Sequence, residues 1–178
     1  MSKKILTKNI LPNRPLFGGF SLLEMLVYIA ILVLLLVIII NITISVVSFQ
    51  RSINVQKSIE NSAMVSFERM TREVRQADSI DTTSSVFGVS PGILVLNSED
   101  GSGNPRTVEF SLSSGEVLMS ENGVSLGSVS QMDTEVTSFI LRHFSNSGIS
   151  GIRIEMILES GTSTHYRSAN FYSSVVLR

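Results

Sequence analysis

The most prominent feature of the sequence is an apolar run near the amino terminus. Residues Met25 to Ile40 carry no charge, and their most polar group is the hydroxyl of Tyr28. With only small polar interruptions the run continues to Phe49. A transmembrane helix needs about 20 apolar residues, and residues 20–41 already supply that length. The pattern therefore predicts a membrane-spanning helix over residues 20–49.

Beyond this run the apolar positions recur at steps of mostly three and four, which is the period of one face of an α-helix. They are Ile53, Ile59, Ala63, Phe67, Met70, Val74 and Ala77. Neither glycine nor proline occurs between Phe20 and Phe87, so nothing stops the first helix before the polar residues 78–85. We therefore expect an amphipathic continuation over residues 50–80. A single helix from Phe20 to Ala77 would be about 87 Å long at about 1.5 Å per residue.

Residues 81–178 have the pattern of a β-rich globular domain. Short runs of β-branched and aromatic residues alternate with turns that contain glycine and asparagine. Candidate strands are residues 85–89, 92–97, 106–112, 116–120, 135–144, 151–158 and 164–176. Strands in direct succession form antiparallel sheets, and the amphipathic helix can cover the apolar face. The predicted fold class is α+β, with one long N-terminal helix packed on an antiparallel β-sheet and the C-terminal tail as its last strand.

Charge is distributed unevenly along the chain. The first nineteen residues contain Lys3, Lys4, Lys8 and Arg14 and no acid. The whole chain has a formal net charge of −1, so residues 20–178 carry −5. Because basic residues before a membrane span stay in the cytoplasm, we expect a single-pass protein of the cytoplasmic (inner) membrane with residues 1–19 inside and the C-terminal domain outside. The charge also predicts no direct nucleic-acid binding, which requires a large positive charge or a clustered basic face.

Catalytic constellations are absent from the sequence. The chain has no cysteine, which excludes disulfides, thiolate metal sites and cysteine nucleophiles. His143 and His165 are each expected on a strand surface, because neither has a second ligand at a metal-binding spacing. The loop Glu99 to Asn104 has two acids and an asparagine but lacks the calcium-loop pattern, and calcium binding stays open. We predict no enzyme activity and no cofactor.

A cleaved secretory signal is a poor explanation of the front end. The apolar segment exceeds the roughly 7 to 15 residues of such a signal, and no convincing small-residue cleavage site follows it. Glu24 lies inside the apolar stretch, where a carboxylate is costly and marks a functional site by default. The alternative for Glu24 is a position at the membrane boundary, where the side chain reaches the polar headgroups.

Residues 17–27 form a more specific motif, FGGFSLLEMLV, between the basic leader and the apolar run. This stretch resembles the class III signal of the type IV pilin superfamily, which includes type IV pilins, type II secretion pseudopilins and competence pilins. The resemblance implies that a prepilin peptidase/methyltransferase removes the leader, residues 1–19, by cutting between Gly19 and Phe20, and that Phe20 is N-methylated. It also assigns an assembly role to Glu24, at the fifth place after the cut.

Physical chemistry makes that role for Glu24 reasonable. In a bundle of such helices the Glu24 carboxylate can pair with the amine of a neighbouring Phe20, and a misaligned neighbour would leave it unpaired at low dielectric.

Residues 67–77 are similar to the corresponding helix of J-type minor pseudopilins, and the lack of cysteine departs from many major pilins. Both points favour a minor subunit. The charged residues of this stretch, Glu68, Arg69, Arg72, Glu73 and Arg75, are expected on a solvated face with (i, i+4) pairs such as Glu68 with Arg72. The alternative is a specific contact of this face with a neighbouring subunit.

The expected function is therefore that of a prepilin-like structural subunit of a type IV pilus or a type II secretion pseudopilus. Its implied partners are the prepilin peptidase/methyltransferase, other pilin or pseudopilin subunits, a membrane platform protein, an assembly ATPase and the lipid bilayer. The alternative is a signal-anchored extracytoplasmic binding domain that is not processed. A membrane-tethered enzyme is disfavoured by the missing constellation.

Overall fold

The structure, a computed structural model, describes residues 19–146, 148–162 and 165–177. Its first element is α1, Leu22–Gln76. The helix begins two residues after Phe20, and it ends one residue before Ala77 and four before residue 80, the predicted limit of the amphipathic continuation. At its end the backbone N–H of Asp78 donates to the carbonyl of Asn97, 2.9 Å away, and this bond directs the chain into the first strand. The chain divides into two compact units, Met1–Val46 and Val47–Arg178, and α1 contributes to both.

In the first unit, every described residue from Gly19 to Val46 is exposed. The most apolar 18-residue window of α1 has a mean hydropathy of 3.2, and none of it is buried. By length and composition α1 can cross a membrane. A bilayer would cover apolar side chains such as Leu26, which is 60% exposed, and Leu34, also 60% exposed.

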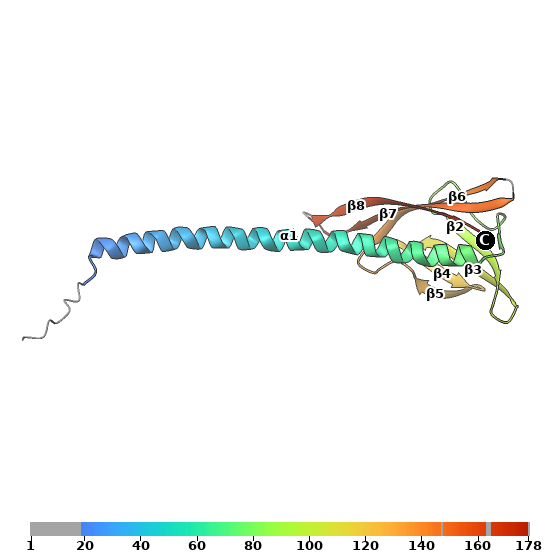
Figure 1. Cartoon of the computed structure of the whole chain (residues 1–178), viewed down its shortest axis with the longest axis horizontal. Coiled ribbons are helices and arrows are strands. Elements are labelled where there is room, and N and C mark those ends of the chain that lie inside the picture. Colours follow the sequence, from blue (N-terminus) through green and yellow to red (C-terminus); the bar gives the residue numbers. More distant parts are fainter. Residues whose placement is uncertain (1–18, 147, 163–164, 178) are drawn as a thin grey trace, which may run out of the picture. The chain divides into compact units, whose positions relative to one another are not determined.

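Within the described residues of the second unit, eight strands lie against the C-terminal half of α1 (Figure 1). The first five form one antiparallel sheet in sequence order: β1 (Ser79–Ile80), β2 (Ile93–Glu99), β3 (Pro105–Ser113), β4 (Glu116–Glu121) and β5 (Val124–Ser128). The last three form a second antiparallel sheet: β6 (Glu135–Asn146), β7 (Ile149–Ser160) and β8 (Arg167–Val176). The predicted α+β class is confirmed: one long N-terminal helix packs on antiparallel β-structure in a pilin-like layout.

The amphipathic stripe of α1 forms the helix side of the core. Ile59, Ala63, Met70, Val74 and Ala77 are at most 3% exposed, as their spacing predicts. Phe67 is partly buried against the same core, whereas Ile53 is exposed at 37% and its expected place is taken by Val55. The sheets supply the opposite side with fully buried residues: Leu94, Phe110, Val117, Phe139, Leu141, Ile152, Ile154 and Leu158. Burial of this apolar surface is the main stabilising contribution.

Most predicted strands are present, with four differences. Residues 85–89 are not a strand; Val86 makes only an isolated bridge to Ile93. Glycine at 88, with a φ of +80°, and proline at 91 interrupt any ladder there. The strands β1 and β5 were not predicted, and the expected single sheet is two sheets.

The C-terminal tail is the final strand, as predicted. The strand β8 pairs with β7 from Arg167 to Val176, and the N–H of Leu177 donates to the carbonyl of Ser150 over 2.9 Å. It begins three residues later than expected; residue 164, the predicted start, lies outside the described residues. Before Arg167 the chain turns, with Gly161 at a φ of +92° and the N–H of His165 donating to the carbonyl of Thr162.

Candidate functional site

The predicted processing site lies immediately before the helix. Gly19, Phe20 and Ser21 are exposed and lie outside α1, whose first hydrogen bond joins the N–H of Met25 to the carbonyl of Ser21 over 3.2 Å. Nothing lies within 4 Å of the position that a Cβ on Gly19 would occupy. The peptide between Gly19 and Phe20 is therefore non-helical and uncovered, as a protease substrate must be.

Glu24 lies in the first turn of α1. Its Oε1 accepts a hydrogen bond from the hydroxyl of Tyr28, at 3.0 Å, and the ring of Tyr28 meets that of Phe20 edge to face, with 6.2 Å between centroids. Tyr28 thus connects two of the predicted site residues, Phe20 and Glu24. The (i, i+4) spacing of Glu24 and Tyr28 is the sequence signal for this contact, and the sequence prediction missed it. A carboxylate in the first turn also interacts favourably with the helix dipole.

A second group of charged residues lies in the second unit, and the prediction was wrong about one of its members. Glu73 was expected on a solvated face, but it is 4% exposed. Its Oε2 accepts from Nη1 of Arg106 at 2.8 Å, and its Oε1 is 3.2 Å from Nη2 of Arg69. The other guanidinium nitrogen of Arg106 donates to Oε2 of Glu121 at 2.8 Å. Because Glu73 is buried, losing its cationic partner would be costly. Since Glu73 lies on α1, Arg106 on β3 and Glu121 on β4, this group joins the three elements.

Hydrogen bonds within this group shift the pKa values of Glu121 and Arg106. The hydrogen bond from Arg106 lowers the pKa of Glu121 below its ordinary value of 4.5. The hydrogen bond to Glu121, followed by that to Glu73, raises the pKa of Arg106. The expected pair of Glu68 and Arg72 is present at 3.0 Å and is exposed, so it contributes little.

Hydroxyl groups hydrogen-bond the connection between β5 and β6 to α1. Oγ of Ser62 accepts from the N–H of Gln131 at 3.0 Å and from the hydroxyl of Thr134 at 2.7 Å. The hydroxyl of Ser66 donates to the carbonyl of Val129 at 3.2 Å, and that of Ser58 donates to the carboxylate of Asp133. Among the described residues no buried side-chain nitrogen or oxygen lacks a hydrogen-bond partner. The polar interior is thus structural.

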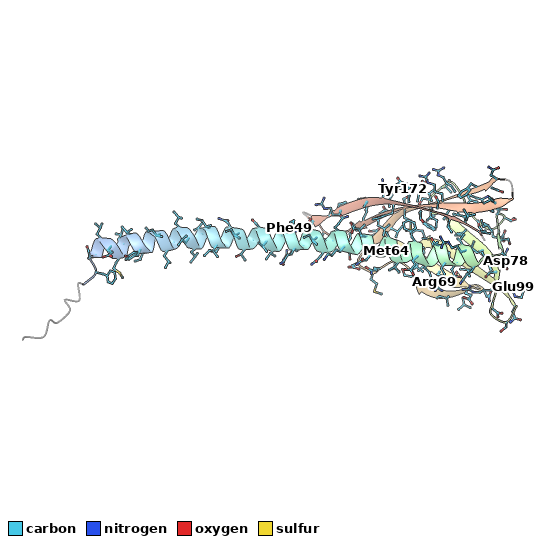
Figure 2. The ribbon with its side chains drawn as sticks, viewed as in Figure 1. Phe49, Met64, Arg69, Asp78, Glu99 and Tyr172 are labelled. Carbon is cyan, nitrogen blue, oxygen red and sulfur yellow. The ribbon has the colours of Figure 1, made fainter. Side chains whose placement is uncertain are left out.

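The outer face of the three-stranded sheet carries an arginine pair. Nε of Arg142 donates to Oε1 of Glu155 over 3.1 Å, and Nε of Arg153 forms an ion pair with the same oxygen at 3.1 Å. The guanidinium of Arg153 also lies 5.4 Å from the ring centroid of Tyr172, which is exposed on β8 (Figure 2). These contacts fix the arginine side chains on a solvent-facing sheet surface.

The loop Glu99 to Asn104, considered above as a calcium site, is held by hydrogen bonds to Asp100. Asp100 accepts hydrogen bonds from the N–H groups of Ser102 and Asn104 and from the amide of Asn104, all at 2.8 or 2.9 Å. These bonds, chiefly the one from the Asn104 side chain, lower the pKa of Asp100 below 3.8 and brace the loop. Across residues 19–146, 148–162 and 165–177, no three His, Cys, Asp or Glu side chains are grouped to hold a metal.

The two histidines differ in their placement. His143 lies in β6 as predicted, half-buried, with a ring nitrogen 2.9 Å from Oγ of Ser150 and its ring 5.6 Å from that of Phe87. His165 precedes β8 in a turn, so its predicted strand position is wrong; the turn at Gly161 delays the strand to Arg167.

A groove of about 760 Å³ in the second unit opens between the start of its helical segment and three turns of the sheets. Its walls include Val55, Ser58, Gly115, Asp133 and Gly161. Its acids are Glu116, Asp133 and Glu135, and Asp133 already accepts from Ser58. The groove is thus lined by acidic side chains and hydroxyl groups.

No family model, curated protein or solved structure matches the chain.

Proposed function

We propose that the chain is a prepilin-like structural subunit that is cleaved after Gly19, N-methylated at Phe20 and assembled into a type IV pilus or a type II secretion pseudopilus as a minor subunit. The observation that carries the proposal is the arrangement at the start of α1. An exposed, non-helical Gly19–Phe20 peptide precedes a helix with Glu24 in its first turn, and none of the described residues covers the apolar part of that helix.

The exposed apolar helix supports an assembly role. A folded chain does not leave so much apolar surface in water, so lipid or neighbouring helices must cover it. Cytoplasmic cleavage before such a helix leaves the helix in the membrane with a cationic amine on Phe20. Glu24 of an adjacent copy supplies a matching carboxylate, and contacts that repeat head to tail without closing make filaments. The chain then depends on a platform protein and an assembly ATPase for extraction from the inner membrane.

The test is co-expression of the full chain with and without a prepilin peptidase/methyltransferase, followed by intact mass and N-terminal peptide analysis of the membrane fraction. We expect loss of residues 1–19 and one methyl group on Phe20. The variant Gly19→Val should stay uncleaved. Since a side chain at 19 meets nothing within 4 Å, failure to cleave reflects recognition and not a disturbed fold. The variant Ser21→Ala serves as the matched control and should be processed.

An intact amino terminus in the presence of an active peptidase would reject this proposal. The remaining hypothesis would then be the signal-anchored extracytoplasmic binding domain, which predicts no processing and no effect of Glu24→Val. A cut between residues 40 and 49 would instead indicate an ordinary exported protein.

A further inference from the structure

Strand β8 forms an open edge of the three-stranded sheet. The strands of this sheet have the order β6-β7-β8, so β8 pairs with β7 on one side only. The pairing runs without a register shift from Arg167 to Val176. On the other side of β8, no backbone group has a hydrogen-bond partner among the described residues. The sheet therefore ends in a regular strand that can accept another one.

The hydrogen-bonding pattern identifies the backbone groups on this open edge. In an antiparallel pair, hydrogen-bonded residue pairs alternate with pairs that do not bond to each other. The N–H of Leu177 donates to the carbonyl of Ser150, so these two residues form a hydrogen-bonded pair. Along the unbroken register the odd-numbered residues of β8 then bond to β7, and the even-numbered residues direct their N–H and C=O groups outward. The outward residues are Ser168, Asn170, Tyr172, Ser174 and Val176.

The other edges of the two sheets are short, irregular or covered. The strand β1 has two residues, and β5 has five residues with a register shift against β4. Along the outer edge of β6, the N–H of Gly88 donates to the carbonyl of Leu141 and that of Gly92 to the carbonyl of Phe139, both over 2.8 Å. Natural proteins use such features, together with charges and prolines, to prevent pairing at sheet edges. Residues 168–176 contain no charge, proline or bulge, so this edge is unprotected.

The two faces of β8 define the side chains that an added strand would need. Ala169 and Phe171 face the core but are only partly buried, although their partners on β7, Leu158 and Met156, are at most 1% exposed. The opposite face of β8 is polar apart from Tyr172, which is 59% exposed (Figure 2). Because cross-strand neighbours on one face pack together, a strand with apolar residues on the core side and polar residues on the other would complete the burial.

A second copy of the chain is a poor occupant if both copies are anchored as proposed above. Arg167, the first residue of β8, bonds to Ser52, and from there β8 runs alongside α1 toward Gln76 (Figure 1). Two β8 strands paired antiparallel would place Val47, where each anchor joins, at opposite ends of the dimer. Two parallel strands related by a two-fold axis would set each outward residue level with its own copy, whereas the slanted bonds of a parallel ladder require a one-residue stagger.

We propose that the outer edge of β8 binds an extended segment of a different polypeptide, which adds as a fourth strand to the three-stranded sheet. Main-chain hydrogen bonds to the outward groups supply the affinity, and the alternating side chains supply the specificity. The segment carries apolar side chains beside Phe171 and polar ones beside Asn170 and Ser174. The proposal goes beyond the proposed function, because the open edge is present whether or not the leader is removed.

The experiment measures amide hydrogen exchange of the full chain in detergent by NMR. The probe is a synthetic peptide of alternating threonine and valine with a lysine at each end, and the same peptide with N-methylated amides is the control. In the free chain we expect slow exchange at Ala169, Phe171, Ser173 and Val175 and fast exchange at the five outward residues. The probe should slow exchange at the outward residues by at least about tenfold. This protection should persist in high salt, because residues 168–176 carry no charge.

A substitution at Ser174 tests the edge itself. Ser174→Pro removes one outward N–H and leaves the bonds to β7 in place, a position where proline is tolerated in an edge strand. We expect this variant to lose the protection given by the probe. Ser174→Ala keeps the N–H and is the matched control, which should retain it. The exchange rates of the parent chain decide the question even if the proline variant does not fold.

Three outcomes would overturn the proposal. The probe could leave the exchange of all five outward residues unchanged, or the N-methylated peptide could protect them equally well. Alternatively, the outward residues could be protected without the probe, to an extent that rises with protein concentration, which would identify a second copy as the occupant. The uncleaved variant Gly19→Val should give the same exchange pattern as the parent. Failure of processing and failure of strand addition are therefore measured separately.

Discussion

Glu73 Oε2 lies 2.8 Å from Arg106 Nη1, and this contact joins the last turns of α1 to strand β3. The Glu73 side chain is 4% exposed, and that of Arg106 is 16% exposed. Neither charge is well solvated, so each depends on the other. Removing one partner of a buried pair leaves an uncompensated charge, which costs more than the pair contributes.

We therefore expect Glu73→Gln to lower the free energy of unfolding by about 3 kcal/mol. The control is Glu68→Gln, five residues earlier on the exposed pair with Arg72, which should cost less than about 0.5 kcal/mol. Denaturant unfolding of both variants in the same detergent makes the comparison. Equal losses in the two variants would contradict a special role for Glu73.

Acidification should weaken the same network. The folded-state pKa of Glu121 lies below its ordinary value of 4.5, chiefly because Arg106 donates a hydrogen bond to it. Its stabilising contribution is complete above pH 4.5 and is lost as the pH falls through the lowered folded pKa. We expect Glu121→Gln to show a shallower loss of melting temperature below pH 4.5 than the parent. If the melting temperatures of Glu121→Gln and the parent fell equally with pH, Glu121 would not be the group responsible.

Ser62 should be the most sensitive of the helix hydroxyls. Ser62→Ala removes the acceptor used by the N–H of Gln131 and the hydroxyl of Thr134. Leaving such groups unsatisfied costs about 1 to 3 kcal/mol. The exposed Ser174, on β8, supplies the control Ser174→Ala, which we expect to change stability by less than about 0.5 kcal/mol. Thermal unfolding measures both, and a neutral Ser62→Ala would contradict the proposed fastening.

Gly151 is a packing position. A Cβ there would lie 2.5 Å from Cζ of Phe144 and 2.7 Å from the carbonyl oxygen of Val175. The ring can move, but the backbone of β8 cannot without disturbing its ladder. We expect Gly151→Ala to cost about 1 to 3 kcal/mol. Gly101→Ala, with nothing within 4 Å, is the control, and equal melting temperatures for the two variants would show that the contact relaxes freely.

We expect the Glu24 carboxylate to be needed for assembly and not for processing. We expect Glu24→Gln to be cleaved and methylated normally but to lower the fraction recovered in sheared filaments by at least about tenfold, because the neutral amide cannot pair with an amine. Tyr28→Phe removes only the hydrogen bond to Glu24 and should have a smaller effect. Normal filament yield from Glu24→Gln would exclude the pairing role.

Helix periodicity predicted α1 and its buried face because the signal repeats along the whole element. It failed at Glu73, whose charged neighbours suggested a solvated surface. Glu73 lies three residues after Met70 and four before Ala77, so it continues the buried stripe. Its partner Arg106 is 33 residues away on another element, and no local pattern connects the two.

Local sequence patterns also failed for strands that depend on tertiary contacts. Alternating residues in β3 and β7 predicted both, whereas β5 contains Ser125, Gly127 and Ser128, and every residue in it is exposed. Such a strand forms because β4 offers it an edge, which is a tertiary cause. The division into two sheets is likewise invisible locally. The roles of Gly19, Phe20 and Glu24 rest on the resemblance of their motif and stay predictions, whereas the ring contact of Phe20 with Tyr28 required coordinates.

The hydroxyls of Ser58, Ser62 and Ser66 recur every four residues, close to one helical turn. If α1 slid by one turn past the β5–β6 connection, two of the three positions would again hold a serine and the third would hold Asn54 or Met70, so the hydrogen bonds at two positions could re-form. The same slide would bring Arg69 or Ala77 opposite Arg106 in place of Glu73. Arg69 would repel the Arg106 guanidinium, and Ala77 would leave it without a buried partner. The repeated hydroxyls thus permit several alignments of helix and sheet, and one carboxylate selects among them.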